Sequence, residues 1–299
     1  MIRVANAPCS WGVLEFDLGP AQAPASQVLD EMAAAGYAGT ELGDWGFLPI
    51  DPQALADELS RRRLSLVGAF VPVAFASADA LPDGIARATR TARLLAGAGA
   101  GDALIVLSDD NATVPHRTTR AGRITEADGL RASEWDGFAD RVAAIAAAVR
   151  DTTGMRSVFH HHCAGYVETP QEIDALMART DPALVGLCLD TGHLMYGGGD
   201  PLVEIAKYGG RICHVHFKDC ARDVAQRARQ EGWDYHTAVR NGIFCELGRG
   251  MVPFADVRDA LQLQRYSGWI VVEQDVLPGL GTPAASAARN RGFLQRIGL

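Results

Sequence analysis

The sequence lacks several features that would place it in a specialised class of protein. None of its six cysteines forms a CxxC pair, the spacing typical of redox-active and zinc-finger sites. It has no basic-plus-apolar leader at its start and no run of about 18 apolar residues, the length that a membrane-spanning helix needs. We therefore expect a cytoplasmic protein with reduced cysteines and no membrane partner.

An excess of basic residues is also absent. The chain carries 28 Lys and Arg residues against 36 Asp and Glu residues, which gives a formal net charge of −8. Because an acidic surface repels the phosphates of nucleic acids, we predict no nucleic-acid partner. A small-molecule ligand is the better expectation, and assembly into a homo-oligomer is left open.

Hydrophobic patterning indicates strands and helices that alternate along the chain. Short apolar runs, typical of parallel strands covered on both faces, predict strands at residues 3–5, 40–42, 65–71, 103–108, 156–162, 184–190, 211–217 and 268–275. Ala-, Leu- and Arg-rich stretches predict helices at residues 25–35, 52–62, 83–96, 134–151, 170–177, 201–207 and 253–263. Thr169 and Asp200 each precede a proline and are predicted N-caps.

Eight strands joined by right-handed crossovers close most simply into a barrel. We therefore predict an α/β fold, a (β/α)8 TIM barrel that forms one domain over residues 1–299. An open doubly wound sheet would need a glycine-rich phosphate loop after the first strand, and residues 6–12 do not supply one. The two longest connections, residues 109–132 and 220–250, are predicted to be binding loops at the catalytic rim.

Histidines and carboxylates stand at the C-terminal ends of the last four predicted strands. These residues are His160, His161, His162, Asp190, His214, His216 and Glu273. Because the C-terminal ends of barrel strands meet at one rim, we expect the polar groups to form one shared site. Histidines in such a setting suggest a metal ion.

Side chains alternate along a strand, and this sets the expected directions of the triple histidine. His160 and His162 should share the face toward the barrel mouth, and His161 should point to the opposite face. A slip of one residue in the register would exchange the two faces.

Several segments, in chain order, carry a resemblance to a known family. They are Ala7–Gly12, Gly36–Gly43, Gly46–Pro49, Phe159–His162, Leu189–His193, His214–Asp219 and Val271–Glu273. Together they resemble the inosose dehydratases (2-keto-myo-inositol dehydratases), which belong to the xylose isomerase-like TIM barrels. The resemblance implies a lyase that removes water from a cyclic polyol ketone in inositol catabolism.

The resemblance also implies a set of metal ligands. Asp190, His216 and Glu273 match positions at which the superfamily carries Asp, His and Glu, and His160 stands where it usually carries Glu. A mixed set of histidine and carboxylate ligands suits Mn²⁺ or Co²⁺, with Zn²⁺ and Mg²⁺ as further candidates. In the related epimerases, glutamates on the fifth and eighth strands move protons on opposite faces of the substrate. A histidine at position 160 therefore favours dehydration.

Proton transfer is predicted to involve His162, His193, Lys218 and Glu273. A metal ion that chelates the ketone would stabilise the enediolate formed when a base takes the α-proton, and the β-hydroxyl would then leave as water. Histidine titrates near neutral pH, and a neighbouring cation lowers the pKa of a lysine. For Lys218 an ion pair with Asp219 or Asp190 is the structural alternative.

Contact with the substrate is predicted for Trp11, Glu41, His193 and His214. Trp11 offers an apolar face to a ring, and Glu41 can accept hydrogen bonds from hydroxyls. Barrel-end packing for Trp11, an ion pair for Glu41 and a helix-start hydrogen bond for His193 are the structural alternatives.

Three other functions stay open at this stage. A keto-sugar isomerase or epimerase of the same superfamily would use the same metal ion and differ only in the fate of the intermediate. A DNA-repair nuclease like endonuclease IV would need further histidines after the third and fourth strands, where the sequence has none. A metal-free binding protein on a barrel scaffold is the third alternative.

Overall fold

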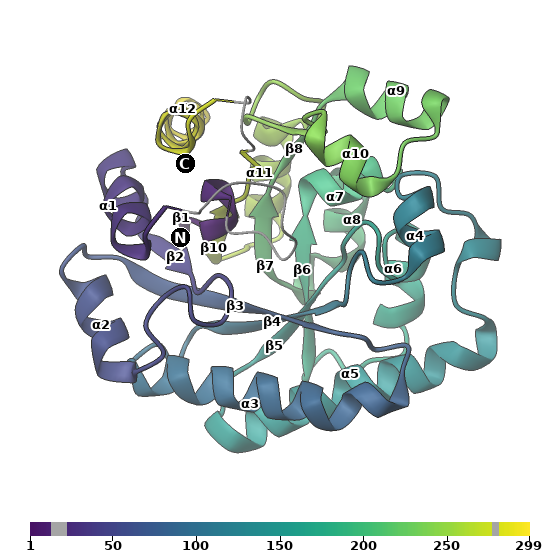
Figure 1. Ribbon diagram of the computed structural model, residues 1–299, viewed down its shortest axis with the longest axis horizontal. Helices are drawn as coiled ribbons and strands as arrows, with labels where there is room; N and C mark the ends of the chain where they lie inside the picture. The colour runs from purple at the N-terminus through teal and green to yellow at the C-terminus, as the bar shows by residue number, and fades with distance from the viewer. Residues whose placement is uncertain (13–22, 277–280) are drawn as a thin grey trace.

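A computed structural model describes residues 1–12, 23–276 and 281–299. Within these residues, eight parallel strands close into a barrel that helices surround (Figure 1). The barrel strands are β1 (Ile2–Asn6), β2 (Gly39–Glu41), β3 (Ser65–Val73), β4 (Leu104–Asp109), β5 (Ser157–His160), β6 (Val185–Asp190), β7 (Ile212–Phe217) and β10 (Gly268–Val272). Their hydrogen-bonded order is β1-β10-β7-β6-β5-β4-β3-β2, with β2 paired back to β1. The predicted single-domain TIM barrel is confirmed.

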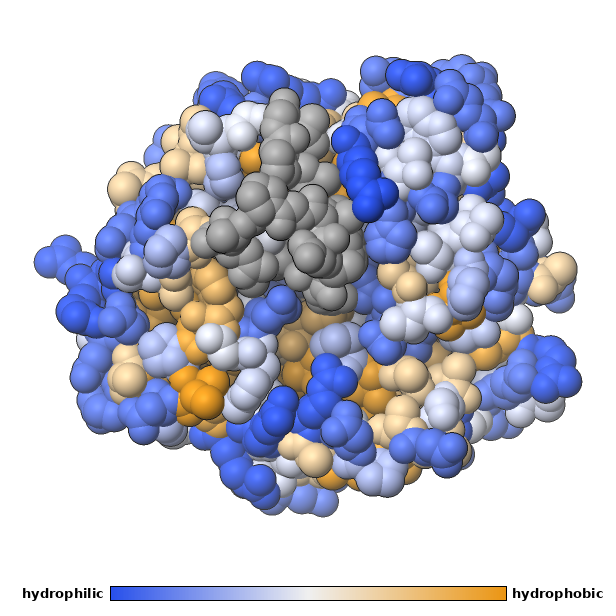
Figure 2. Space-filling view, viewed as in Figure 1, coloured by the Kyte–Doolittle hydropathy of each residue, from blue (hydrophilic) through white to orange (hydrophobic). Residues whose placement is uncertain are grey.

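The helices of the outer layer agree closely with the predicted ones. They are α1 (Ala25–Ala35), α2 (Pro52–Ser60), α3 (Leu81–Gly97), α5 (Ala132–Thr153), α6 (Pro170–Met177), α8 (Pro201–Tyr208), α11 (Phe254–Leu263) and α12 (Pro283–Arg296). Thr169 and Asp200 are N-caps as predicted, since their side chains accept hydrogen bonds from the backbone N–H groups of Glu172 and Leu202. Helix α12 was not predicted, and it packs beside α1 (Figure 1). The edge of the molecule in Figure 2 is mostly hydrophilic, as expected where outer helices face solvent.

Two strands end two or three residues earlier than the apolar pattern predicted. β5 ends at His160 instead of residue 162, because the backbone N–H of His162 donates to Val167 O (3.2 Å) in the following segment and not to a neighbouring strand. β10 ends at Val272 instead of residue 275. The polar residues that follow these strands therefore lie on the rim itself, outside the regular ladder.

The two long rim connections contain structure that was not predicted. The first holds α4 (Pro115–Arg120), and the second holds α9 (Arg222–Glu231), α10 (Tyr235–Arg240) and a two-stranded antiparallel ribbon, β8 (Asp219–Cys220) with β9 (Phe244–Cys245). A further short helix, α7 (Thr191–Tyr196), follows β6. In Figure 1, α9 and α10 lie beyond the ends of β6 and β7, on the side where the predicted site residues gather.

A buried ion pair ties the first rim connection to the segment after β5. The Arg117 side chain is fully buried, and its two terminal nitrogens donate to the two carboxylate oxygens of Glu172 at 2.8 and 2.9 Å. Its Nε donates to Gly165 O at 2.8 Å. The pair therefore holds α4, α6 and the chain near His162 together, with the charge of each partner compensated by the other.

Replacing Glu172 by alanine is expected to destabilise the fold by about 3–5 kcal/mol, because it leaves the Arg117 guanidinium buried without a counter-charge. Chemical unfolding of the purified variant measures this effect as a lower denaturation midpoint. Arg131→Ala is the matched control, since its ion pair with Glu134 is exposed and exposed pairs contribute little. Equal midpoints for Glu172→Ala and the wild type would show that the buried pair does not stabilise the fold.

Candidate active site and metal centre

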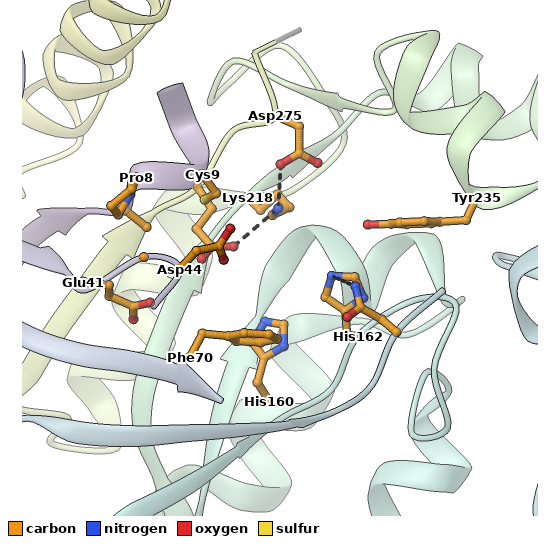
Figure 3. A pocket seen from close by; sticks show the side chains of 14 residues that line it. Pro8, Cys9, Glu41, Asp44, Phe70, His160, His162, Lys218, Tyr235 and Asp275 are labelled. Atoms are coloured by element: carbon orange, nitrogen blue, oxygen red, sulfur yellow. Dashed lines mark hydrogen bonds and ion pairs between the residues drawn. The ribbon is translucent and has the colours of Figure 1, made fainter. Parts of the chain in front are cut away.

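A pocket opens at the C-terminal ends of the barrel strands (Figure 3). The described residues that line it are Ala7, Pro8, Cys9, Glu41, Gly43, Asp44, Phe70, Asn111, His160, His162, Lys218, Tyr235, Glu273 and Asp275. In Figure 3 the rings of His160 and His162 lie across the cavity from Lys218 and Asp275. Strands from opposite sides of the barrel therefore place their polar ends around one space, as predicted from the strand ends.

Four of the predicted residues form a compact group. His160, Asp190, His216 and Glu273 each offer one ligand atom, and these four atoms lie within 4.8 Å of one another. His160 Nε2 lies 3.5 Å from Asp190 Oδ2, and His216 Nδ1 lies 3.8 Å from the same oxygen. His216 Nδ1 is also 3.3 Å from Glu273 Oε1. We call these four residues, His160, Asp190, His216 and Glu273, the metal quartet; they are the four metal ligands predicted from the sequence.

The atoms of the metal quartet have the character of metal ligands. His160 Nε2, Asp190 Oδ2 and His216 Nδ1 are buried and accept or donate no hydrogen bond within the described part of the chain. Buried polar atoms normally have a partner, so three that converge without one indicate a missing group. The other oxygen of Asp190, Oδ1, accepts from the backbone N–H of His193 at 2.8 Å. That hydrogen bond caps α7 and leaves Oδ2 for the centre of the group.

Electrostatics also suit a cation at this position. Burial lowers the pKa of His160 to about 3, so this imidazole is neutral and can act as a ligand. Cys188 lies close enough to join His160 and His216, but burial raises the pKa of its thiol to about 12. Because metal ions bind the thiolate, Cys188 is a poor ligand here, and the residues of the metal quartet fit a divalent ion better.

The triple histidine is arranged around this centre. His160 and His162 line the pocket, while His161 is not among the lining residues. His161 is fully buried, and its Nε2 accepts a hydrogen bond from the backbone N–H of Asp190 at 3.2 Å. The directions expected from strand alternation therefore match the geometry, although His162 lies just beyond the end of β5.

The hydrogen bonds of His162 define its tautomer. Its Nδ1 lies 2.6 Å from the carbonyl oxygen of Cys163, which can only accept, so the ring proton is on Nδ1. Its Nε2 then carries a lone pair, and Asn111 Nδ2 lies 3.4 Å away from it. Burial lowers the pKa of His162 well below the usual value, which favours the neutral ring. His162 therefore presents a proton acceptor to the pocket.

His193 lies behind His162 and does not line the pocket. Their ring centroids are 3.7 Å apart, and His193 Nδ1 accepts a hydrogen bond from the backbone N–H of Cys163 at 3.3 Å. The position at the start of α7 agrees with the helix-start alternative for this residue. His193 can therefore affect a ligand in the pocket only through its neighbours, which include the rings of His162 and Tyr235.

Lys218 is held by carboxylates in the pocket wall. Its Nζ lies 3.3 Å from Asp275 Oδ1 and 3.4 Å from Glu273 Oε2, so the partners are not Asp219 or Asp190 (Figure 3). Burial lowers the pKa of Lys218, but the charges of Asp275 and Glu273 raise it by more, and the net shift is well above the usual value. The carboxylates therefore favour an ammonium ion at Lys218, which can donate a proton, and the lowering expected beside a bound cation stays a prediction.

Two predicted substrate contacts point elsewhere. Trp11 is buried, and its Nε1 donates to Glu31 on α1 at 2.6 Å, so the ring belongs to the packing between the barrel end and the outer layer. His214 lies one layer below the pocket, and its Nε2 is 2.7 Å from Glu41 Oε1. Neither residue lines the pocket within the described chain, so neither prediction of a substrate contact agrees with the geometry.

The structure adds pocket residues that sequence reasoning missed. Asn111 follows β4, Tyr235 begins α10, and Asp275 follows β10. Asn111 and Tyr235 lie in the two long connections that were predicted to be binding loops, so the sequence indicated their region but not the individual residues. Asp275 was not predicted as a pocket residue because the apolar pattern placed it inside a strand.

Comparison with known proteins agrees with the barrel fold. A model of the family described as xylose isomerase-like TIM barrel matches residues 29–297. A protein of Geobacillus kaustophilus named inosose dehydratase is 33% identical over 99% of this chain and 94% of its own. Inosose dehydratases of Lacticaseibacillus casei and Bacillus anthracis are each 31% identical, over 98% of this chain and 96% of theirs.

The chain belongs to the inosose dehydratase family. The match extends over nearly the whole chain and over nearly the whole of these relatives, so it is not a likeness of one motif. Membership confirms the predicted enzyme class, a lyase of the dehydratase type, over the alternative of a binding protein without catalysis. The family's fold is the barrel described above.

Solved structures show how widely this barrel is shared among enzymes. A probable 3-DHS dehydratase of Bacillus anthracis superimposes with a TM-score of 0.70 at 14% identity, over 99% of both chains. A D-allulose 3-epimerase of Methylomonas gives a TM-score of 0.70 at 17% identity, over 99% of this chain and 98% of that one. At such identities the likeness supports the fold alone.

Proposed function

We propose that the protein is a metal-dependent dehydratase that removes water from a cyclic polyol ketone such as 2-keto-myo-inositol. The single observation that carries the proposal is the metal quartet, His160, Asp190, His216 and Glu273, two of which line the pocket, in a chain of the inosose dehydratase family. The quartet has a histidine, His160, as the last residue of β5, the position at which the sequence resemblance favours elimination over epimerisation.

The charges of the pocket wall favour a neutral, hydroxyl-rich substrate. Glu41, Asp44, Glu273 and Asp275 are carboxylates, and Lys218 is the only Lys or Arg among the described lining residues. A phosphate or carboxylate on the substrate would meet this acidic wall at close range, which costs electrostatic energy. Hydroxyl groups can instead donate to the carboxylates, so an uncharged polyol is the favoured class.

The metal quartet would hold Mn²⁺ or Co²⁺, because a set of two imidazoles and two carboxylates suits these ions. Such an ion, when bound, supplies Lewis acidity that polarises the ketone and makes the neighbouring C–H more acidic.

The chain's own residues would move the protons of the elimination. The Nε2 lone pair of His162 faces the pocket and can accept the α-proton. The ammonium of Lys218, held by Asp275 and Glu273, can donate a proton to the hydroxyl on the next carbon. The C–H and C–O bonds break, a C=C bond forms, and one water leaves. The enol that remains rearranges to a diketone.

An epimerase of keto-sugars is the second candidate, since barrels of very similar shape catalyse that reaction and Glu273 lines the pocket here. It would need a second group that returns the proton to the opposite face of the same carbon. A DNA-repair nuclease fits less well, because the pocket is acidic and β3 and the segment after β4 contribute Phe70 and Asn111 to it in place of further histidines.

No helix within the described residues is long and apolar enough to cross a membrane. The proposed reaction on a small polyol ketone and the predicted cytoplasmic location require none.

The product of 2-keto-myo-inositol, incubated with the enzyme and Mn²⁺ or Co²⁺, is expected to be lighter than the substrate by one water. Mass spectrometry of a panel of inososes and ketohexoses measures this directly. A product of unchanged mass, with solvent deuterium at an inverted carbon, would replace the dehydratase proposal by the epimerase one. Endonuclease IV-like activity can be checked in parallel on DNA with abasic sites, where we expect none.

A further inference from the structure

Glu41 lies at the C-terminal end of β2 and contacts two histidines of β7. Its side chain is 4% exposed, and one oxygen, Oε1, lies 2.7 Å from His214 Nε2 and 3.0 Å from His216 Nε2. A glutamate is ordinarily ionised at neutral pH, and a single oxygen that meets two imidazole nitrogens at these distances is the arrangement of a carboxylate that accepts from both. A carboxylate only accepts hydrogen bonds, so both Nε2 atoms must carry a hydrogen.

The tautomer of His216 decides which of its nitrogens can bind a metal ion. With a hydrogen on Nε2, a neutral imidazole has its lone pair on Nδ1. His216 Nδ1 is the atom that lies 3.3 Å from Glu273 Oε1 and 3.8 Å from Asp190 Oδ2. The hydrogen bond to Glu41 therefore selects the form of His216 that directs a lone pair to the metal quartet.

The position of Glu41 depends on a glycine in the neighbouring strand. The register between β2 and β3 shifts between Thr40 and Glu41, and the carboxylate that follows the shift lies against the histidines of β7. A Cβ atom at Gly68 would lie 3.2 Å from Glu41 Oε1 and 3.4 Å from Val106 Cγ2. The missing side chain at Gly68 leaves the space that the carboxylate occupies.

We propose that Glu41 is a positioning residue that fixes His216 as the Nε2–H tautomer and thereby aims Nδ1 at the metal ion. The proposal rests on the metal site of the proposed function, and it gives Glu41 a role other than the substrate contact predicted from the sequence. A carboxylate that accepts from the far nitrogen of a metal-bound histidine sets the orientation of the ring and raises its basicity. The hydrogen bond that His214 Nε2 donates keeps Glu41 Oε1 in place between the two imidazole rings.

A second metal site is the competing interpretation. Glu41, His214 and His216 lie within 4.8 Å of one another, so their geometry alone could accommodate an ion. Both nitrogens, however, lie at hydrogen-bond distances from a single oxygen. We therefore expect one bound ion per chain, and two would overturn the proposal.

The tautomer can be read directly by nitrogen NMR of the full chain labelled with ¹⁵N-histidine, with Zn²⁺ as a diamagnetic probe. His216→Gln identifies the signals of His216. In the Zn²⁺-bound wild type we expect a hydrogen on Nε2 of His216 and a shifted signal for its Nδ1. An Nδ1–H form, or coordination through Nε2, would contradict the proposal.

Metal affinity supplies the second readout. Glu41→Ala should lower Zn²⁺ affinity by about 10- to 100-fold, the usual effect of losing such a partner. Glu41→Gln keeps an acceptor of similar shape without the charge, so its loss should be smaller. Asp51→Asn is the control, because Asp51 caps α2 by accepting from Ala54 N at 2.9 Å and does not line the pocket, and it should bind Zn²⁺ like the wild type.

Wild-type Zn²⁺ affinity in both Glu41 variants would overturn the proposal. If Glu41→Ala does not fold, Glu41→Gln decides, since circular dichroism and the His216 tautomer can be measured on the same sample. None of these experiments uses an inosose. A protein that binds Zn²⁺ as expected but leaves every inosose unchanged would refute the proposed reaction and not the role of Glu41.

Discussion

Replacing Asp190 by asparagine is expected to lower Mn²⁺ affinity by more than about 100-fold and to abolish dehydration. Loss of a histidine's outer partner typically costs about 10- to 100-fold, and loss of a direct ligand should exceed that. Asparagine keeps the oxygen that caps α7 by accepting from the backbone N–H of His193, so the fold should persist. The substitution removes the negative charge at the centre of the metal quartet.

Titration calorimetry with Mn²⁺ and a dehydration assay on the same preparation measure both effects. Asp200→Asn is the matched control, because Asp200 caps α8 by accepting from Leu202 N at 2.8 Å and lies outside the metal quartet. Prolonged chelation of the wild type should likewise abolish activity, and Mn²⁺ or Co²⁺ should restore it. Full activity in a chelated, metal-free sample would end the proposal of a metal-dependent reaction.

Replacing His162 by glutamine is expected to lower kcat by about 10²- to 10⁴-fold, the range for losing a general base, while metal affinity stays at the wild-type level. The reason is the division of roles within the triple histidine. His160 Nε2 belongs to the metal quartet, whereas His162 Nε2 is directed to Asn111 and the pocket. Glutamine preserves polarity and size but cannot accept a proton at neutral pH.

Steady-state kinetics with saturating Mn²⁺, combined with metal titration, separate the two roles. His116→Gln serves as the control, since His116 is an exposed histidine of the first rim connection and should have no effect. Parallel loss of metal binding and activity in His162→Gln would assign His162 to the metal ion. Unchanged kcat would remove it from proton transfer and leave Lys218 and Glu273 as the remaining candidates.

Much of the site could be predicted because a parallel barrel converts position in the sequence into position in space. Each apolar run ends at the same rim, so His160, Asp190, His216 and Glu273 were expected to meet before any contact was known. Strand alternation predicted that His161 would point away from the face shared by His160 and His162, and its hydrogen bond with the backbone N–H of Asp190 agrees. These inferences rest on local periodicity, which a single sequence displays directly.

Partners of individual side chains could not be predicted in the same way. Glu41 and His214 are separated by 173 positions, and their hydrogen bond depends on a register shift in β2 and on the space beside Gly68. Lys218 meets Asp275 because the strand before Asp275 ends at Val272, three residues earlier than its apolar pattern indicated. Both contacts follow from where regular pairing stops, and composition does not reveal that point.

The sequence by itself determined the barrel, its single shared rim and the residues that gather there, because apolar runs, capping residues and alternation act over a few neighbouring positions. Only the tertiary structure decided what each of those residues does. It turned Trp11 toward Glu31, placed His214 beneath the pocket on Glu41, and surrounded Lys218 with carboxylates that raise its pKa. Orientation, tautomer and charge depend on atoms a few ångströms away, and in a closed barrel those atoms come from strands that are distant in the chain.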